Sequence, residues 1–269
     1  AVSVYLGECA VCGGVGCLKR TLHDSKLLTA ALIGDVWTPA NSIATRLGGF
    51  CDPALFSNEG YPEFPFTKAG SMFRFKLQNR YFALTTFHQT KGYQLNKLLT
   101  PAIETNIYVS AERVIFPTVE ANADAEVDLV LYEFTWSVQA NKIRKTGWLD
   151  ISREIQLGRT SSSDRAVCIG YPGYRNIIDY DLGNYNARPH SVWGTECAPS
   201  ITGLLSFDVN PELDYDPSGM SGGPVFGVKI ENFCPIVRFS GIASNASRKK
   251  FNFIPISAIS SYIHRVLAE

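Results

Sequence analysis

The sequence predicts an all-β core that is preceded by a partly helical extension and followed by a C-terminal helix. From about residue 67, short apolar runs rich in valine, isoleucine, phenylalanine and tyrosine recur between clusters of turn-forming residues. The first 66 residues lack this pattern, and the last segment, 256–267, carries apolar residues at helical spacing instead. Many short strands at such spacing are typical of β-barrels or a β-sandwich.

The core begins with a predicted hairpin. In SMFRFKLQ, Phe73 and Phe75 alternate with Arg74 and Lys76, which is the pattern of a half-buried strand. The polar QNR predicts a turn, and YFALTTF predicts a second strand that ends at His88. Further strands are predicted in NIYVSAERVIF, VDLVLYEFTW, RAVCIGYPGY, HSVWGTEC, ITGLLSFDVN, GPVFGVKI and PIVRFSGIAS.

The two ends of the chain differ from this core. In the extension, residues 1–66, the apolar residues Leu27, Leu28, Ala31 and Leu32 recur at helical spacing, and Gly34 is a plausible stop. Residues 52–66, rich in Pro, Gly and Asp, are interpreted as a loop or linker. Near the C-terminus, Pro255 precedes a predicted amphipathic helix, 256–267, with these apolar residues at helical spacing: Ile256, Ile259, Ile263 and Val266.

The composition argues against two classes of partner. The 25 basic and 25 acidic side chains cancel, so no basic surplus favours nucleic acid or an anionic membrane surface. No apolar stretch approaches the length that spans a bilayer. The first residues, AVSVYLGECAVC, have no basic residue before their apolar run and include Glu8, so they do not match a secretory signal.

The chain has seven cysteines, an odd number that excludes complete pairing within one chain. Some lie inside apolar runs, which is typical of reduced, buried thiols, so we expect a reducing, cytoplasmic compartment. A zinc site is an alternative for one group, with His23 or Cys51 completing the set. Its candidate cysteines are Cys9, Cys12, Cys17 and Cys51. Because only one paired-cysteine knuckle is present, a helical docking or regulatory extension with reduced thiols is the favoured interpretation.

The segment DPSGMSGGPVFGV, residues 216–228, carries the strongest chemical signal. Ser221 lies among three glycines that let the backbone turn tightly and let a substrate carbonyl approach main-chain N–H groups. In this arrangement the amides of Gly219 and Ser221 would face a developing oxyanion. A serine hydroxyl needs a base to become a good nucleophile. By itself the segment is equally compatible with a glycine-rich turn.

Two other residues supply what this serine would need. His88 ends the predicted hairpin, where a side chain can reach a cleft. Asp128 heads the apolar strand DLVLYEF, where a carboxylate without a partner would be costly to bury. An imidazole N–H is the expected partner, since the carboxylate would fix its tautomer. Asp124 and Glu126 are nearby rivals, but they precede the apolar run.

Together these motifs resemble the trypsin/chymotrypsin-like serine peptidase family, particularly its bacterial-type members. GMSGGPVF is similar to the family's GxSGGP motif, and GSMFRFKLQNRYFALTTFH to the hairpin that carries its base. VDLVLYEF, RAVCIGYPG and FSGIASNA resemble three further family strands, and the order His, Asp, Ser is the family's order. Met220, where Asp or Asn is usual, and Thr86 depart from the family pattern.

The resemblance implies two six-stranded antiparallel β-barrels, about 67–142 and 143–255, with the triad in the cleft between them. It implies a serine endopeptidase that needs no cofactor: Ser221 as nucleophile, His88 as base and Asp128 as its orienting residue. Its substrate is a protein or peptide, and we expect the extension or a protein partner to regulate it. The alternative is a catalytically silent binding module on the same fold.

The family's substrate pocket is built by the residues just before the nucleophile and by the strand after it. Here these are Tyr215, then Ser244, Asn245 and Ala246. If Tyr215 forms the base of the pocket, large basic side chains are disfavoured. If a lysine of the run 248–250 turns in, an acidic side chain is favoured, although a solvated loop is the simpler interpretation.

Overall fold

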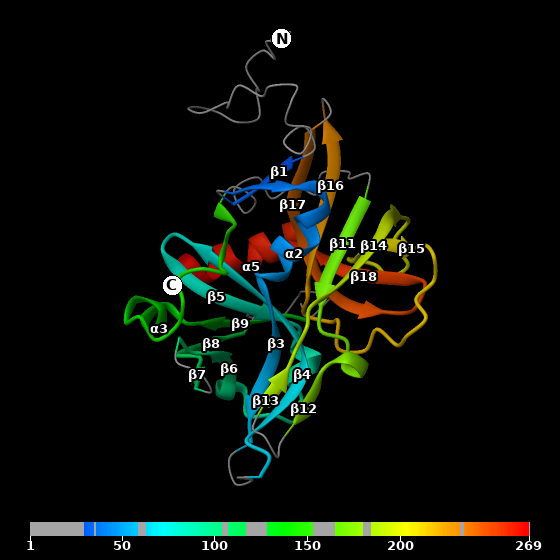
Figure 1. The fold of residues 1–269 in the computed structure, drawn as a ribbon. Helices are drawn as coiled ribbons and strands as arrows, with labels where there is room; N and C mark the ends of the chain where they lie inside the picture. Colours follow the sequence, from blue (N-terminus) through cyan, green and yellow to red (C-terminus); the bar gives the residue numbers. More distant parts are fainter. Residues whose placement is uncertain are drawn as a thin grey trace.

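A computed structural model of the chain describes residues 30–34, 36–58, 63–103, 107–116, 128–152, 165–179, 184–231 and 234–268. Two bodies of β-structure lie side by side, and helix α5 (Ile256–Ala268) lies across their junction (Figure 1). None of the helices in these residues has the length and apolar character that crossing a membrane requires.

The described part of the extension is not helical where a helix was predicted. β1 (Ala30–Ile33) and β2 (Val36–Pro39) form an antiparallel hairpin. Gly34 sits in the turn with φ +57°, a conformation that glycine adopts without strain. Three of the four β1 side chains are buried. Packing of this short segment as a strand therefore outweighed the helical spacing of its apolar residues. Leu27 and Leu28 lie outside the described residues.

A short helical segment connects this hairpin to the first sheet. The 3₁₀ turn η1 (Ala40–Ser42) leads into α2 (Ile43–Gly48), which buries Ile43 and Leu47. β3 (Cys51–Ser57) then begins, so residues 52–57 belong to a strand and not to a linker. Ser71, opposite Pro53, donates its N–H to Ser221 instead of to β3, so the missing N–H of the proline leaves no gap in the ladder.

The first sheet has eight strands and starts before residue 67. Its order is β7-β6-β3-β4-β5-β9-β8, with β10 (Leu149–Asp150) parallel to β4. The strands not yet bounded are β4 (Phe66–Leu77), β5 (Arg80–Thr85), β6 (Leu98–Pro101), β7 (Tyr108–Ser110), β8 (Arg113–Ile115) and β9 (Val130–Glu133). Within the described residues the end strands β7 and β8 are three residues each and do not pair, so the predicted closed first barrel is instead a partial one.

The second sheet closes into a six-stranded antiparallel barrel, as predicted, with order β11-β14-β15-β18-β17-β16. Its strands are β11 (Arg165–Gly170), β14 (His190–Cys197), β15 (Leu205–Val209), β16 (Pro224–Glu231), β17 (Cys234–Ala246) and β18 (Lys250–Pro255). A small hairpin of β12 (Ile177–Asp179) and β13 (Asn184–Asn186) extends from it toward β4, after the 3₁₀ turn η4 (Gly173–Arg175).

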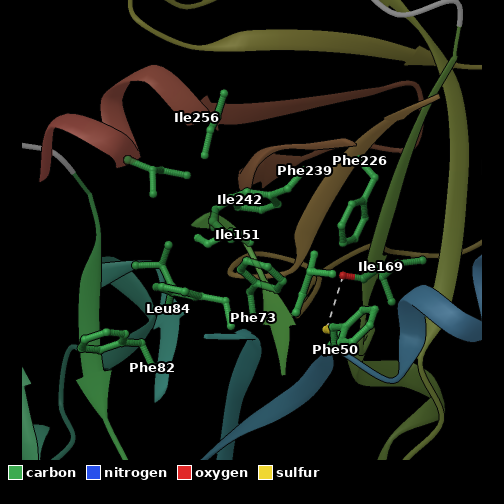
Figure 2. Packing of buried hydrophobic residues seen from close by; sticks show 14 of the residues in the cluster. Phe50, Phe73, Phe82, Leu84, Ile151, Ile169, Phe226, Phe239, Ile242 and Ile256 are labelled. Atoms are coloured by element: carbon green, nitrogen blue, oxygen red, sulfur yellow. Dashed lines mark hydrogen bonds between the residues drawn. The ribbon is translucent and has the colours of Figure 1, made fainter. Parts of the chain in front are cut away.

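The two bodies share one hydrophobic core. Phe73 of β4 stacks on Phe239 of β17 at 4.4 Å and meets Phe226 of β16 edge-on at 6.2 Å between ring centroids (Figure 2). The predicted terminal helix is confirmed as α5, whose Ile256 and Ile259 enter this core. Burial of so many large side chains fixes the relative position of the two bodies, and with it the cleft between them.

The remaining elements are short. The 3₁₀ turns η2 (Phe87–Thr90) and η3 (Leu95–Lys97) follow β5, and α3 (Thr135–Gln139) follows β9. The Glu112 carboxylate accepts the N–H groups of Trp136 and Ser137 at the start of α3, at 2.8 and 2.5 Å. It therefore supplies the acceptor that the first turn of a helix lacks.

Candidate active site

A cleft of about 420 Å³ between the two bodies gathers the predicted chemical residues. His88, Asp128 and Ser221 all line it, although they come from distant parts of the chain. Its other lining residues are Pro217, Ser218, Ser244, Asn245 and Ala246.

Asp128 holds His88 through two hydrogen bonds. β5 ends at Thr85 and the chain turns into η2, which directs the imidazole toward the cleft. The backbone N–H of His88 donates to Asp128 Oδ1 at 2.8 Å, and Nδ1 lies 2.6 Å from Oδ2. An ionised carboxylate only accepts hydrogen bonds, so Nδ1 carries the proton and Nε2 is left as the free acceptor.

Asp128 is placed just before β9 and is only partly covered. Its side chain is 32% exposed and that of His88 is 42% exposed, so the pair lies at the mouth of the cleft. The Ser244 hydroxyl also donates to Asp128 Oδ2, at 3.4 Å. The imidazole of His88 therefore lies beside this carboxylate, as the sequence predicted. The carboxylate is, however, partly exposed and not fully buried.

The Ser221 loop has the tight turn that its glycines predict. Gly219 has φ +94° and Gly222 has φ +80°, both in the region that favours glycine. The Ser221 hydroxyl donates to the carbonyl of Ser244 at 2.7 Å rather than to the imidazole. The nucleophile candidate therefore lies in the same cleft as His88, with its hydroxyl turned toward β17.

The amides predicted to face an oxyanion are not used within the loop. The neighbouring amides are engaged, since Met220 donates to Pro217 and Gly222 donates to Ala243, at 3.0 and 2.8 Å. Among the described residues, neither the Gly219 nor the Ser221 N–H donates to a backbone carbonyl. Both donors remain for a ligand oxygen, which is what an oxyanion site needs.

Ser71 and Gln89 brace this loop, and the sequence did not single them out. The fully buried Ser71 accepts the Tyr171 N–H at 2.8 Å and donates its hydroxyl to the Gly219 carbonyl at 2.7 Å. The Ser221 carbonyl accepts the Ser71 N–H at 3.0 Å and the Gln89 amide at 2.8 Å. Ser71 lies in the Gly-Ser pair that opens the resembling hairpin, and that pair was the available signal.

Replacing Ser71 by alanine is expected to lower both stability and hydrolysis. The change leaves the part-buried Gly219 carbonyl and the buried Tyr171 N–H without their partner, which costs about 2 kcal/mol of the free energy of unfolding. Loosening the peptide between the two oxyanion amides should also lower kcat roughly tenfold. Urea denaturation and steady-state kinetics on one preparation measure the two effects.

Ser240→Ala is the matched control for this prediction. Ser240 is also a buried serine whose hydroxyl binds main chain, accepting the Gly227 N–H at 2.9 Å, but it belongs to the body of the second barrel. We expect a similar loss of stability with kcat unchanged. Equal kcat values for the two variants would show that Ser71 does not position the loop.

Of the predicted substrate residues, Ser244, Asn245 and Ala246 line the cleft, but Tyr215 does not. Tyr215 stacks on Tyr174 at 4.6 Å and meets His190 edge-on at 5.0 Å between ring centroids. Aromatic packing holds it against the second barrel, outside the lining of this cleft, and its role in substrate binding stays a prediction.

The basic run after β17 also lies outside the cleft lining. Lys249 pairs with Glu212 at 3.5 Å and Lys250 with Asp208 at 3.6 Å. The side chain of Lys249 is 75% exposed, which agrees with a solvated loop. These lysines therefore supply no charge to the wall beside Ser221.

The two departures from the family pattern are both buried. Met220 packs in the core of the second barrel, so apolar contact holds the loop one residue before Ser221. Thr86, two residues before His88, is fully buried. Neither side chain lines the cleft, and neither departure removes a chemical group from it.

Cys51 is poorly placed as a zinc ligand. Its thiol lies in the shared core and donates to the Ile169 carbonyl at 3.5 Å. Burial raises the pKa of this thiol, whereas a metal ligand must be the thiolate. Within the described residues, no three His, Cys, Asp or Glu side chains gather as a metal site. The other candidates, Cys9, Cys12, Cys17 and His23, lie outside these residues.

Comparison with known proteins places the fold. No family model and no curated protein matches the sequence. The solved structure of human heparin binding protein is similar with a TM-score of 0.54 and 15% identity, over 83% of this chain and 93% of that one. A thermostable serine protease from an extremophilic microorganism is similar with a TM-score of 0.46 and 15% identity, over 83% and 100% of the two chains.

The closed barrel, the partial barrel and the C-terminal helix, together with the first similarity, define a trypsin-like fold in broad terms. At 15% identity the likeness extends to the fold alone. The chemistry must therefore be argued from the cleft itself.

Proposed function

We propose that this protein is a serine endopeptidase in which Ser221 attacks a peptide carbonyl with His88 as base and Asp128 as its orienting residue. The observation that carries the proposal is the pair of hydrogen bonds between Asp128 and His88, one to the backbone N–H and one to Nδ1, in the cleft that also holds Ser221. This arrangement leaves Nε2 of His88 as the unprotonated ring nitrogen, available to take the proton of the Ser221 hydroxyl.

The chemistry needs one rotation of the Ser221 side chain. The hydroxyl leaves the Ser244 carbonyl, which it binds at 2.7 Å, and turns to Nε2 of His88. The hydroxyl proton passes to Nε2 as Oγ bonds the substrate carbonyl carbon, and the amides of Gly219 and Ser221 receive the oxyanion. His88 then gives its proton to the leaving amine as the C–N bond breaks.

The acyl-enzyme is resolved by the same groups in reverse. Water donates a proton to His88 and its oxygen attacks the ester carbon, which releases the acid and restores Ser221. Every proton in the cycle moves through Nε2 of His88. The roles of Asp128 are to hold the ring and to stabilise the imidazolium that forms twice in each turnover.

Extended peptide can enter along β17. β16 pairs with β17 only as far as Ile242, and the following residues, Ser244 to Ala246, have β18 on one side and the cleft on the other. An exposed strand edge accepts an extended segment by main-chain hydrogen bonds. The acyl part of a substrate would therefore lie beside these residues.

Mass spectrometry of a random peptide library tests the proposal. Wild type should generate new peptide termini, and the Ser221→Ala variant, prepared in parallel, should generate none. Equal cleavage by both proteins would trace the activity to a contaminant and would overturn the assignment. The cleavage sites would also give the preference of the cleft.

Binding without catalysis is the second candidate function, and one observation favours it. The Ser221 hydroxyl binds the Ser244 carbonyl and not the imidazole, so the nucleophile is not aligned for attack in this state. The similar human protein is named for heparin binding, but this chain, with 25 basic and 25 acidic side chains, offers no basic surplus for a polyanion. Labelling of Ser221, described in the Discussion, separates the two functions.

A further inference from the structure

A second hollow, of about 400 Å³, lies next to the cleft. It runs between residues 67–69 of β4 and the segment that leads into the β12–β13 hairpin, where Gly173 and Asn176 line it. Ser218 lines both hollows, and Gly219 lines the second. We call it the Lys68 pocket. The Lys68 pocket therefore begins at the loop that carries Gly219 and Ser221, on the side of this loop away from β17.

Lys68 is the charged residue of this pocket. Its ammonium donates to the carbonyl of Tyr171, and an added Cβ on Gly219 would lie 3.0 Å from Nζ. The side chain is partly buried. Within the described part of the chain, no carboxylate lies at ion-pairing distance from it.

Placing a partly buried ammonium without a carboxylate costs free energy, and a bound anion would offset that cost. Burial lowers the pKa of Lys68 to about 8, so the group is still mostly protonated at neutral pH. The Tyr171 carbonyl satisfies one of the three N–H donors and leaves two. A partly buried ammonium without a carboxylate is the setting in which a charge-assisted bond to a ligand gains most.

The position of the pocket identifies the part of a substrate that reaches it. If the acyl segment lies along Ser244 to Ala246, the scissile carbonyl sits over Gly219 and Ser221. The leaving segment must then continue past Ser218 and Gly219 into the other hollow. Its first residues pass beside Nζ of Lys68.

We propose that Lys68 recognises a carboxylate on the leaving segment, so that this peptidase prefers an acidic residue at the first or second position after the cleaved bond. The inference rests on the proposed function, because it needs an acyl-enzyme at Ser221. It assigns to Lys68 a specificity role in binding and no part in the bond-breaking steps.

An acyl-transfer experiment measures this preference without knowledge of the natural substrate. p-Nitrophenyl acetate acylates the enzyme and releases p-nitrophenol. Dipeptide amides then compete with water for the acetyl group: Glu-Ala-NH₂ against Gln-Ala-NH₂, and Ala-Glu-NH₂ against Ala-Gln-NH₂. The acetylated products are quantified by mass spectrometry. We expect wild type to favour the glutamate probe of one pair by about fivefold, since the glutamine oxygen can still accept from the ammonium but carries no negative charge.

Three variants assign the preference to this ammonium. Lys68→Met keeps the length of the side chain and should bring the ratio of acetylated products to one. Lys68→Arg keeps the charge and should retain a ratio above one. Lys145→Met removes an exposed lysine outside both hollows and should leave the wild-type ratio unchanged.

The pH dependence provides an independent readout. Lys68 is charged below its pKa of about 8, so the preference should be present below that pH and lost above it. Burial is the larger influence on this pKa, and the Cys51 thiol is the one titratable group among the described residues that opposes it. Ala-Glu-NH₂ and Ala-Gln-NH₂ share the α-amine of alanine, so the pH series uses this pair and the titration of the amine cancels in the ratio.

The outcomes are distinct. A ratio of one in wild type with normal p-nitrophenol release, or an unchanged ratio in Lys68→Met, overturns the inference and leaves the peptidase proposal standing. An equal loss of all transfer products in Lys68→Met would show that the lysine acts on acyl transfer in general and not on a carboxylate, and also overturns the inference. Absence of p-nitrophenol release above the Ser221→Ala blank would overturn both proposals together.

Discussion

Replacing Asp128 by asparagine should lower kcat/KM for peptide hydrolysis about 10⁴-fold while the fold persists. The carboxylate now accepts the Nδ1 proton at 2.6 Å and the His88 backbone N–H at 2.8 Å. An asparagine amide that donates to Nδ1 would hold the opposite tautomer, with the proton on Nε2. The ring would then have no free electron pair for the Ser221 proton.

Asp150→Asn is the control for this substitution. Asp150 is an exposed carboxylate that pairs with Lys76 at 3.6 Å and lies outside the cleft. We expect its kcat/KM to stay within about twofold of wild type, since surface ion pairs contribute little. If Asp128→Asn behaved in the same way, with its fold intact by circular dichroism, His88 would not be the base.

Substituting alanine for Gly222 is expected to lower the free energy of unfolding by roughly 4 kcal/mol. An added Cβ would lie 2.0 Å from the Ser71 carbonyl oxygen and 2.3 Å from Thr85 Oγ1. The carbonyl belongs to buried main chain, so it cannot move aside as a flexible side chain would. The positive φ of +80° adds backbone strain for alanine.

Gly203→Ala separates the two contributions. Gly203 has a similar φ of +83°, but nothing lies within 4 Å of an added Cβ there. The control should therefore lose only the strain, about 1 kcal/mol. Urea denaturation of both variants gives the difference, and equal losses would mean that the Ser221 loop is not pressed against β4 as described.

The chemical residues were predictable because each had a local signal. Ser221 lies in a glycine cluster, His88 ends a hairpin and Asp128 heads an apolar strand. The structure brings all three into one cleft, which is the arrangement that the family resemblance implies.

Parts of the fold were not predictable because tertiary contacts decided them. Residues 30–33 form too short an apolar run for its period to distinguish a helix from a strand, and pairing with β2 selected the strand. Residues 52–57 look like a loop because of their proline, but opposite Pro53 the Ser71 N–H is turned to Ser221. The open edge of the first sheet likewise depends on pairing between short strands, which the sequence pattern does not encode.

The missed site residues share one cause. Ser71 and Gln89 act on the main chain of a loop about 150 and 132 positions away, and Lys68 meets Gly219 across the same boundary. Spacing along the chain carries no trace of such contacts. Tyr215 shows the converse, since its sequence position suggested a part in the cleft but it stacks on Tyr174 and does not line that cleft.

Labelling with a fluorophosphonate tests the central claim most directly, because the reagent bonds only a serine that a base activates. Peptide mapping of labelled wild type should place the adduct on Ser221, and His88→Ala should abolish it. Unlabelled Ser221 in folded wild-type protein, or equal labelling in the His88→Ala variant, would contradict the proposed nucleophile and base.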